Sequence, residues 1–249
     1  KWISKILTLK RDDLFELLND DELEDFLGVS EVKKALHVKK GLFLQPPELK
    51  KKLLENCFIK IILNEKFVSF TEEKNKVEVA FKSGLRKSYD ALAVCTGKGL
   101  KDFNNNLKVS YGQMAGISNK DLFNIKKPLN HQGYIIPKVN GTNWIGSTYE
   151  QSTDFKKEKI EDKVKLNHAI FGKKGMPFEI QDLWEGERVS TRSNLPIASK
   201  MPGAKNIYCI GGLGSRGISY APFLAEIVSS AIQNKQIPLS KEIFTLLKI

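Results

Sequence analysis

The residues with the clearest chemical character lie near the C-terminal end, in the stretch IYCIGGLGSRGISYAPFLAEI. Gly212, Gly214 and Gly217 form a G-x-G-x-x-G pattern that follows the apolar run 207–210 and precedes a helical pattern. Glycine lets a backbone approach a ligand because it has no Cβ, and the N–H groups at a helix N-terminus attract negative charge. The pattern therefore predicts a loop that holds an electron-rich group, such as a pyrophosphate or the edge of a flavin ring.

This loop does not belong to a complete Rossmann unit. Such a unit continues into a second strand and carries an acidic residue about 20 residues downstream. Here the helix is followed by KQIPLSKEIFTLLKI, which has no convincing strand pattern. A tight strand-to-helix turn that binds nothing is the alternative interpretation of these glycines.

The charge balance limits the classes of partner. The net charge of +11, from 40 Lys and Arg against 29 Asp and Glu, suits a polyanion such as RNA. A solvent surface rich in lysine would give the same balance. No apolar run reaches the ~18 residues of a membrane span. We see no signal peptide and expect a cytoplasmic protein that does not contact a membrane. The chain does not begin with Met, so we expect it to be a fragment.

Cysteines and histidines offer no metal site and no nucleophile–base pair. Cys57, Cys95 and Cys209 each lie in an apolar run and are interpreted as buried thiols, without a disulfide framework. No His/Cys cluster has zinc spacing. The histidines lie apart in the sequence and are interpreted as surface or packing residues; they are His37, His131 and His168.

Strand and helix patterns alternate along the whole chain, which is expected of two domains interleaved in one polypeptide. Asn140 and Gly141 predict a hairpin turn, because both tolerate positive φ. The expected helices cover 11–27 with Gly28 as the end, a stretch within 41–55 with Pro47 in its first turn, 155–170 and 219–233. The expected strands cover 59–63, two segments of 67–81, 89–97 as a strand buried on both faces, the hairpin 133–149, and 183–191 before a turn. The last helix is expected to bury Ala221, Leu224, Ala225, Val228 and Ala231.

Several of these stretches resemble one known family. GLGSRGISYAPFLAEIVSSAIQNKQIP resembles the C-terminal flavin loop and helix of the D-amino-acid-oxidase-like (DAO) FAD enzymes. TRSNLP resembles the TR-D-x-L-P motif of the members that modify tRNA, with Ser193 in place of Asp. GYIIP followed by IGSTY resembles their substrate-domain hairpin, SYGQ their crossover strand, YDALAVCTG their "ATG"-type strand and GLFLQPPELKKKLLE their Pro-x-x-L helix. The resemblance spans most of residues 36–238.

The resemblance implies an α/β (α+β) fold, in which a Rossmann-like FAD domain, incomplete here, is interleaved with a mostly antiparallel substrate domain. We expect FAD-domain portions at 41–97 and 201–249, and substrate-domain portions at 1–40 and 98–200. The N-terminal G-x-G-x-x-G with which the family holds the ADP part of FAD is not found. We therefore expect an upstream unit to supply it, and expect this chain alone to bind FAD weakly. A methyltransferase domain precedes the oxidoreductase domain in bifunctional members.

The resemblance also implies site residues. Arg192 is the first candidate for holding a substrate carboxylate, since arginine can form two parallel charge-assisted hydrogen bonds; a salt bridge to Glu185 or Glu187 is its structural alternative. Tyr134 is the second candidate, with packing on the sheet as the alternative. Three more residues are candidates for the pocket: Gln113, Tyr149 and Arg188, the last as a weaker anchor. The expected flavin contacts are Thr96, Gly97, Gly211, Gly212, Leu213, Gly214, Ser215, Arg216, Gly217 and Ile218.

Three functions stay open. The implied reaction is the FAD-dependent oxidative removal of the carboxymethyl group from carboxymethylaminomethyl-uridine at the tRNA wobble position. An FAD-dependent oxidase of small amines such as glycine is the second. A non-catalytic, basic RNA-binding domain is the third.

Overall fold

The computed structural model describes residue 6 and residues 8–28, 32–55, 58–104, 106–118, 122–123, 125–150 and 157–235. Cys57, the C-terminal tail after 235 and the start of the helix expected at 155 lie outside these residues. Helices and strands alternate as the sequence predicted, so the mixed α/β class is confirmed. The chain forms two compact units, Lys1–Ile59 with Gly112–Gly186, and Lys60–Tyr111 with Glu187–Ile249. The predicted boundaries lay at 40/41, 97/98 and 200/201; which unit serves FAD and which serves substrate stays a prediction.

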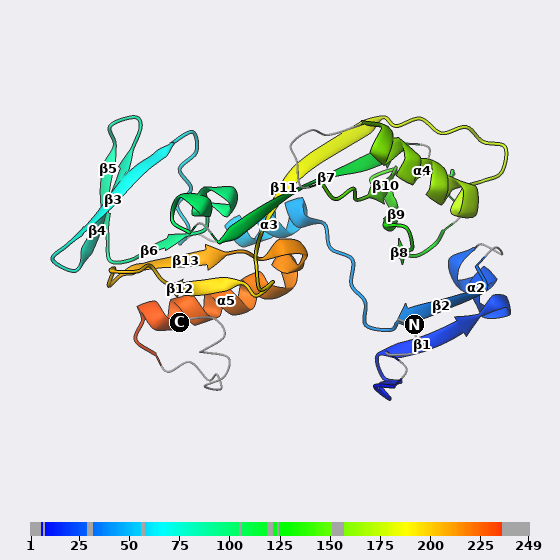
Figure 1. The fold of residues 1–249 in the computed structure, drawn as a ribbon, viewed down its shortest axis with the longest axis horizontal. Helices are drawn as coiled ribbons and strands as arrows, with labels where there is room; N and C mark the ends of the chain where they lie inside the picture. Colours follow the sequence, from blue (N-terminus) through cyan, green and yellow to red (C-terminus); the bar gives the residue numbers. More distant parts are fainter. Residues whose placement is uncertain are drawn as a thin grey trace. The chain divides into compact units, whose positions relative to one another are not determined.

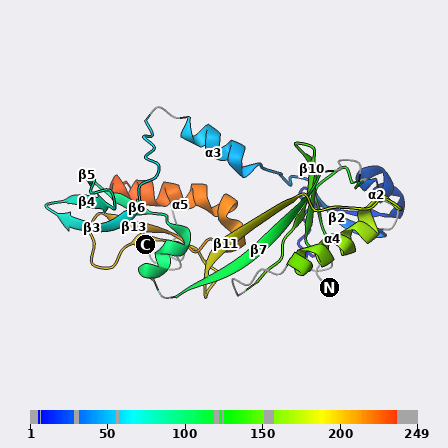
Figure 2. The same cartoon turned by 90° about the horizontal axis from the view of Figure 1, so that it is seen from above.

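The first unit is built on a five-stranded sheet of order β11-β7-β10-β9-β8 (Figure 1). Its strands are β7 (Leu107–Ile117), β8 (Leu129–Asn130), β9 (Tyr134–Val139), β10 (Thr142–Gly146) and β11 (Asp182–Thr191), of which β7 and β11 continue into the second unit. Helix α4 (Lys157–Phe171) packs on β10 (Figure 2). The remaining elements are the antiparallel pair β1 (Phe15–Asn19) and β2 (Lys34–Val38), with α2 (Asp20–Leu27) between them, and α3 (Pro46–Leu54).

One face of this sheet makes the core of the first unit. Ala115, Ile117, Ile135 and Ile145 are 0–1% exposed and pack with α4 and α2 side chains. Because side chains alternate along a strand, their neighbours Met114, Gly116, Tyr134, Trp144 and Gly146 lie on the opposite face, which we call the open face.

The second unit contains the parallel pairing that a nucleotide-binding fold requires. Its central strand β13 (Ile207–Gly211) pairs parallel to β6 (Leu92–Val94) and antiparallel to β12 (Ile197–Lys200). Helix α5 (Gly217–Ile232) packs along β12 and β13 (Figure 1). A meander of β3 (Phe67–Glu73), β4 (Lys76–Phe81) and β5 (Arg86–Tyr89) completes the unit, together with the 3₁₀ turns η1 (Gly97–Asp102) and η2 (Gly214–Arg216).

Two turns formed as the sequence predicted. Gly28 ends α2 in the left-handed conformation, with φ of 79°, and its N–H bonds the carbonyl of Glu24. Asn140 and Gly141, with φ of 51° and 86°, make the turn between β9 and β10. Both positions need a residue that tolerates positive φ, and the sequence supplies one at each.

Four predictions about elements were wrong. Residues 15–19 are strand β1 rather than helix, because they pair with β2. Residues 59–63 have no strand partner and are not a strand. The segment predicted as a strand buried on both faces contains only β6, whose Ala93 is exposed, and Cys95 directly after it is exposed as well. Helix α5 buries Leu224 and Val228 as predicted, but it also buries Ile227, while Ala221 and Ala225 of the predicted face are exposed.

Glu72 on β3 fastens the meander to the turn that precedes β13. Its carboxylate accepts the backbone N–H groups of Lys205 at 2.8 Å and Asn206 at 2.7 Å. Hydrogen bonds to a charged acceptor contribute about 1.5–3 kcal/mol each at most, and Glu72 is half-buried. We expect Glu72→Ala to lower the free energy of unfolding by about 1–3 kcal/mol in urea denaturation, and Glu72→Gln by less. No loss in Glu72→Ala would contradict this role.

Candidate functional site

The loops expected to hold the flavin meet at one edge of the sheet in the second unit. Strands β6 and β13 are parallel, so the loops that follow them leave from the same edge, where ligands of α/β sheets bind. Thr96 and Gly97 follow β6, and the glycine loop 211–218 follows β13. A Cβ built at Gly211 would collide with Leu100 of η1, so the end of β13 packs against the turn after β6.

The glycine loop depends on its glycines for conformation and space. Gly212 and Gly214 have φ of 66° and 56°, where other residues are strained. A Cβ on Gly212 would lie 2.8 Å from Cγ2 of Thr191. The turn η2 then leads into α5, whose first turn has no side-chain cap and no acidic residue. The N–H groups of that turn are therefore suited to a negatively charged or electron-rich group.

The turn 191–196, which carries Arg192, is joined to this loop. Ser190 forms an antiparallel bridge with Leu213, and Nη2 of Arg216 donates to the carbonyl of Asn194 at 2.7 Å. Within the turn, the Thr191 hydroxyl donates to the carbonyl of Leu195 at 2.6 Å. The sequence motif TRSNLP and the glycine loop, about 20 residues apart, thus form one surface.

Arg192 is the first residue after β11 and its side chain is exposed. Within the described parts of the chain it has no ion pair. The two glutamates of its structural alternative have other partners, since Glu187 binds Nζ of Lys98 at 2.8 Å and Glu185 accepts from Gln113. The hydrogen bond to Glu187 raises the pKa of Lys98, so this lysine is charged at neutral pH. Arg192 is therefore available for an anionic ligand.

The thiols near the loops are not activated nucleophiles. Cys95 is exposed, which corrects its predicted burial, yet the surrounding protein partly desolvates its thiol and raises its pKa. Burial, with a smaller effect of Cys95, raises the pKa of Cys209. Both thiols are protonated at neutral pH, and the thiolate is the reactive form.

The histidines pack against aromatic rings. His37 lies 4.5 Å from the Phe26 ring, His131 edge-on to Phe171, and His168 against Phe178. Among the described residues, no group of three or more His, Cys, Asp or Glu is placed to hold a metal ion. No described helix is both long and apolar enough to cross a membrane.

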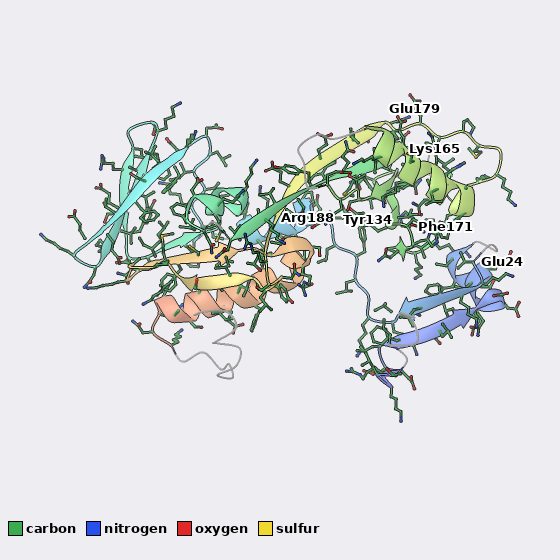
Figure 3. All side chains as sticks on the ribbon, viewed as in Figure 1. Glu24, Tyr134, Lys165, Phe171, Glu179 and Arg188 are labelled. Atoms are coloured by element: carbon green, nitrogen blue, oxygen red, sulfur yellow. The ribbon has the colours of Figure 1, made fainter. Side chains whose placement is uncertain are left out.

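Tyr134 belongs to the first unit and is labelled in Figure 3; the strand register places it on the open face of the sheet. It pairs with Gly146, and its ring lies over that glycine, because a Cβ there would be 2.9 Å from the hydroxyl oxygen. Gly146 in turn pairs with Met114. Glycine at this position gives the tyrosine ring room to lie along the sheet.

The other pocket candidates are placed differently. Gln113 is 2% exposed on the face opposite Tyr134, where its Nε2 donates to Oε1 of Glu185 at 2.8 Å. Its backbone N–H donates to the Thr148 hydroxyl at 3.0 Å. The side chain of Gln113 therefore links β7 to β11, and it lies on the other side of the sheet from Tyr134. Tyr149 is 64% exposed, and Arg188 is half-buried in β11.

Sequence reasoning missed residues on the open face. Trp184 is 57% exposed, and a Cβ on Gly186 would collide with its indole. Met114, Gly146 and Gly186 complete this surface. The W-x-G spacing in β11 was the available signal, because it places the tryptophan and the glycine on the same side of a strand.

The described residues fit one part of FAD. The uncapped start of α5 and the loop 211–218 suit the flavin or its pyrophosphate, and no side chain with negative charge lies in that first turn. Thr96 and Gly97 leave from the same sheet edge. A second glycine loop for the ADP part is not among the described residues.

Comparison with known proteins agrees with this geometry. The family described as "FAD dependent oxidoreductase" (DAO) matches residues 2–231. The tRNA 5-methylaminomethyl-2-thiouridine biosynthesis bifunctional protein MnmC of Idiomarina loihiensis is 26% identical over 239 residues, which are 92% of this chain and 39% of that protein. The protein of the same name from Haemophilus ducreyi is 22% identical and covers 93% of this chain. The chain thus spans about 40% of the length of these curated relatives.

Solved structures support the same fold. Glycine oxidase from Bacillus cereus superposes with a TM-score of 0.81 at 20% identity, covering 94% of this chain and 70% of that one. Iminodiacetate oxidase from Chelativorans has a TM-score of 0.77 at 13% identity, covering 97% and 71%. The predicted DAO-like fold is confirmed.

Proposed function

Because the chain belongs to the FAD dependent oxidoreductase (DAO) family, whose cofactor is FAD, we propose that it provides the flavin loop and the substrate surface of an enzyme that modifies tRNA. The proposed reaction removes the carboxymethyl group from carboxymethylaminomethyl-uridine at the wobble position. The observation that carries it is the joined pair of loops, in which the glycine loop and the Arg192 turn form one surface. Similarity to MnmC proteins over 92% of the chain supports the choice of substrate.

In this reaction the secondary amine of the substrate loses a hydride from the carbon next to its carboxylate, and the proton on its nitrogen passes to water. FAD, when bound, accepts that hydride with its two electrons. The resulting imine takes up water and separates into aminomethyl-uridine and glyoxylate. Arg192 holds the carboxylate through its planar guanidinium, and Tyr134 is the second candidate for that carboxylate. The thiols and histidines have no part in the reaction.

The chain's own residues orient the reactants. The loop 211–218 and the start of α5 would hold the electron-rich part of the flavin, and Thr96 with Gly97, at the same sheet edge, would contribute to that site. Arg188, half-buried in β11, is the alternative anchor for the carboxylate. We place the enzyme in the cytoplasm with tRNA, and propose that a methyltransferase domain accompanies it, as in the bifunctional relatives.

Oxidation of a small amine is the second candidate, because glycine oxidase shares the fold with a TM-score of 0.81. The two candidates differ in their need for phosphate contacts. The net charge of +11 favours tRNA. A purely RNA-binding role, the third candidate, has no observation in its favour, because the chain belongs to a family of FAD dependent oxidoreductases. FAD bound to the full-length protein would argue against it.

We expect the affinity for tRNA to fall about tenfold between 50 and 200 mM salt, because each phosphate contact releases counterions. Fluorescence anisotropy with labelled tRNA measures this, and oxidation of free glycine, measured in parallel, should change little. An affinity for tRNA that is absent or insensitive to salt would favour the small-amine oxidase.

A further inference from the structure

We propose that Trp184 stacks on the nucleobase that carries the reacting side chain, and that it selects a tRNA substrate over a free amine. This inference rests on the function proposed above. It concerns only the open face of the sheet in the first unit, with Trp184 on β11, Met114 on β7, Gly146 on β10 and Tyr134 on β9.

These four residues form one row across four adjacent strands. Gly146 is paired with both Tyr134 and Met114. The side chain of Asp182 lies against Gly116, where a Cβ would be 2.8 Å from Cβ of Asp182. Trp184 and Met114 each lie two residues from that contact, so strand alternation places them side by side. Aromatic rings therefore stand at the two ends of the row, with glycine and methionine between them.

Side chains already fill the glycine positions of this row. The Tyr134 ring and Cγ of Met114 lie over Gly146, and the Trp184 indole lies over Gly186. Neighbouring strands lie about 4.8 Å apart, so the row from β9 to β11 spans roughly 14 Å. The two rings and the methionine together present an apolar surface on which a flat ring can stack.

The indole of Trp184 is accessible for stacking with a base. It is 57% exposed, and in the described portion of the chain it has no hydrogen bond and no ring partner. An exposed tryptophan leaves a large apolar surface in water, which stacking with a base would remove. Base–aromatic stacking is a general means of binding unpaired nucleotides.

The side chain of the proposed substrate spans part of this row. Four single bonds join its ring to its carboxylate carbon, a reach on the order of 5–6 Å. A base stacked on Trp184 can therefore direct its carboxylate over Met114, in the direction of the Tyr134 ring that lies over Gly146. A small amine lacks the base and gains nothing from the tryptophan.

The test uses the FAD-loaded protein and two substrates, an anticodon stem–loop with carboxymethylaminomethyl-uridine and N-ethylglycine. We expect Trp184→Leu to raise KM for the stem–loop about tenfold, to leave kcat within twofold, and to leave kcat/KM for N-ethylglycine unchanged. Trp184→Phe should recover most of the loss. Tyr89→Leu, which removes an aromatic residue that is 38% exposed on β5, is the matched control and should change neither substrate.

Binding gives a second readout that does not depend on turnover. The stem–loop should quench tryptophan fluorescence in the unaltered protein, and Trp184→Phe should remove most of the quenching. An unchanged KM for the stem–loop in Trp184→Leu, or equal losses on both substrates, would overturn the stacking role while leaving the proposed function in place. If the unaltered protein oxidises N-ethylglycine but not the stem–loop, the proposed function fails and this inference fails with it.

Discussion

Arg192→Ala should lower kcat/KM for the carboxylate substrate about 10- to 150-fold, because it removes a charge-assisted pair worth roughly 1.5–3 kcal/mol. The side chain is exposed directly after β11, in the turn joined to the glycine loop. Arg192→Lys should recover only part of the loss, since a point charge cannot form two parallel hydrogen bonds. FAD content and affinity for bulk tRNA should stay near normal. Steady-state kinetics and flavin absorbance measure these quantities on the same preparations.

The control for this prediction is Arg86→Ala, which removes the same charge from β5 and breaks only the exposed pair with Glu78 at 2.7 Å. It should leave the kinetics unchanged. Arg188→Ala tests the competing anchor. If Arg188→Ala carries the loss and Arg192→Ala does not, Arg188 holds the carboxylate. Full activity of Arg192→Ala with a lowered melting temperature would assign Arg192 a structural role.

Local sequence signals predicted the parts of the fold that local physics decides. The apolar run before the glycines became β13, and the periodic pattern after them became α5. Asn140 and Gly141 gave their turn because positive φ at both residues restricts the choice of amino acids. The same reasoning placed Arg192 at the end of a strand.

Predictions failed where a distant partner decides the structure. Leu14, Leu17 and Leu18 have helical spacing, but β1 forms because residues 15–19 pair with 34–38. Residues 59–63 are as apolar as a buried strand, yet Ile59 and Leu63 are 47% and 76% exposed and no strand pairs with them. A single sequence does not reveal such pairings.

The candidate site likewise has one part that depends on local sequence and another that depends on strand pairing. The loop proposed to hold the flavin is one continuous segment, so its conformation could be predicted from its glycines, and its flavin contacts stay a prediction. The open face collects single residues from four strands, and its row depends on register, which sequence alone does not give. Strand alternation likewise turns Gln113 to the face opposite Tyr134, which its sequence context did not reveal.

Gly212→Ala should strongly reduce both stability and FAD content. Residue 212 has φ of 66°, and its new Cβ would lie 2.8 Å from Cγ2 of Thr191, which belongs to the turn that carries Arg192. A left-handed conformation costs an alanine about 1–2 kcal/mol, and overpacking typically adds about 1–3 kcal/mol. We therefore expect the free energy of unfolding to fall by about 2–5 kcal/mol. The loop should also shift, so the flavin absorbance per protein should decrease well below that of the unaltered protein.

Gly214→Ala separates the two causes of this effect. Residue 214 has a similar φ of 56°, but the nearest atom to its new Cβ is Cβ of Ser190 at 3.6 Å, an ordinary contact. The free energy of unfolding of Gly214→Ala should therefore fall only by the cost of the left-handed conformation, about 1–2 kcal/mol. This variant should also retain more FAD than Gly212→Ala. Thr191→Ser in the Gly212→Ala background removes the methyl group that collides and should restore part of both losses, while the hydroxyl that binds the carbonyl of Leu195 remains. The result against this account would be equal losses of stability and FAD in Gly212→Ala and Gly214→Ala, with no recovery in the double variant. Backbone strain alone would then explain both losses, and the contact between the glycine loop and the Arg192 turn would have no part in them.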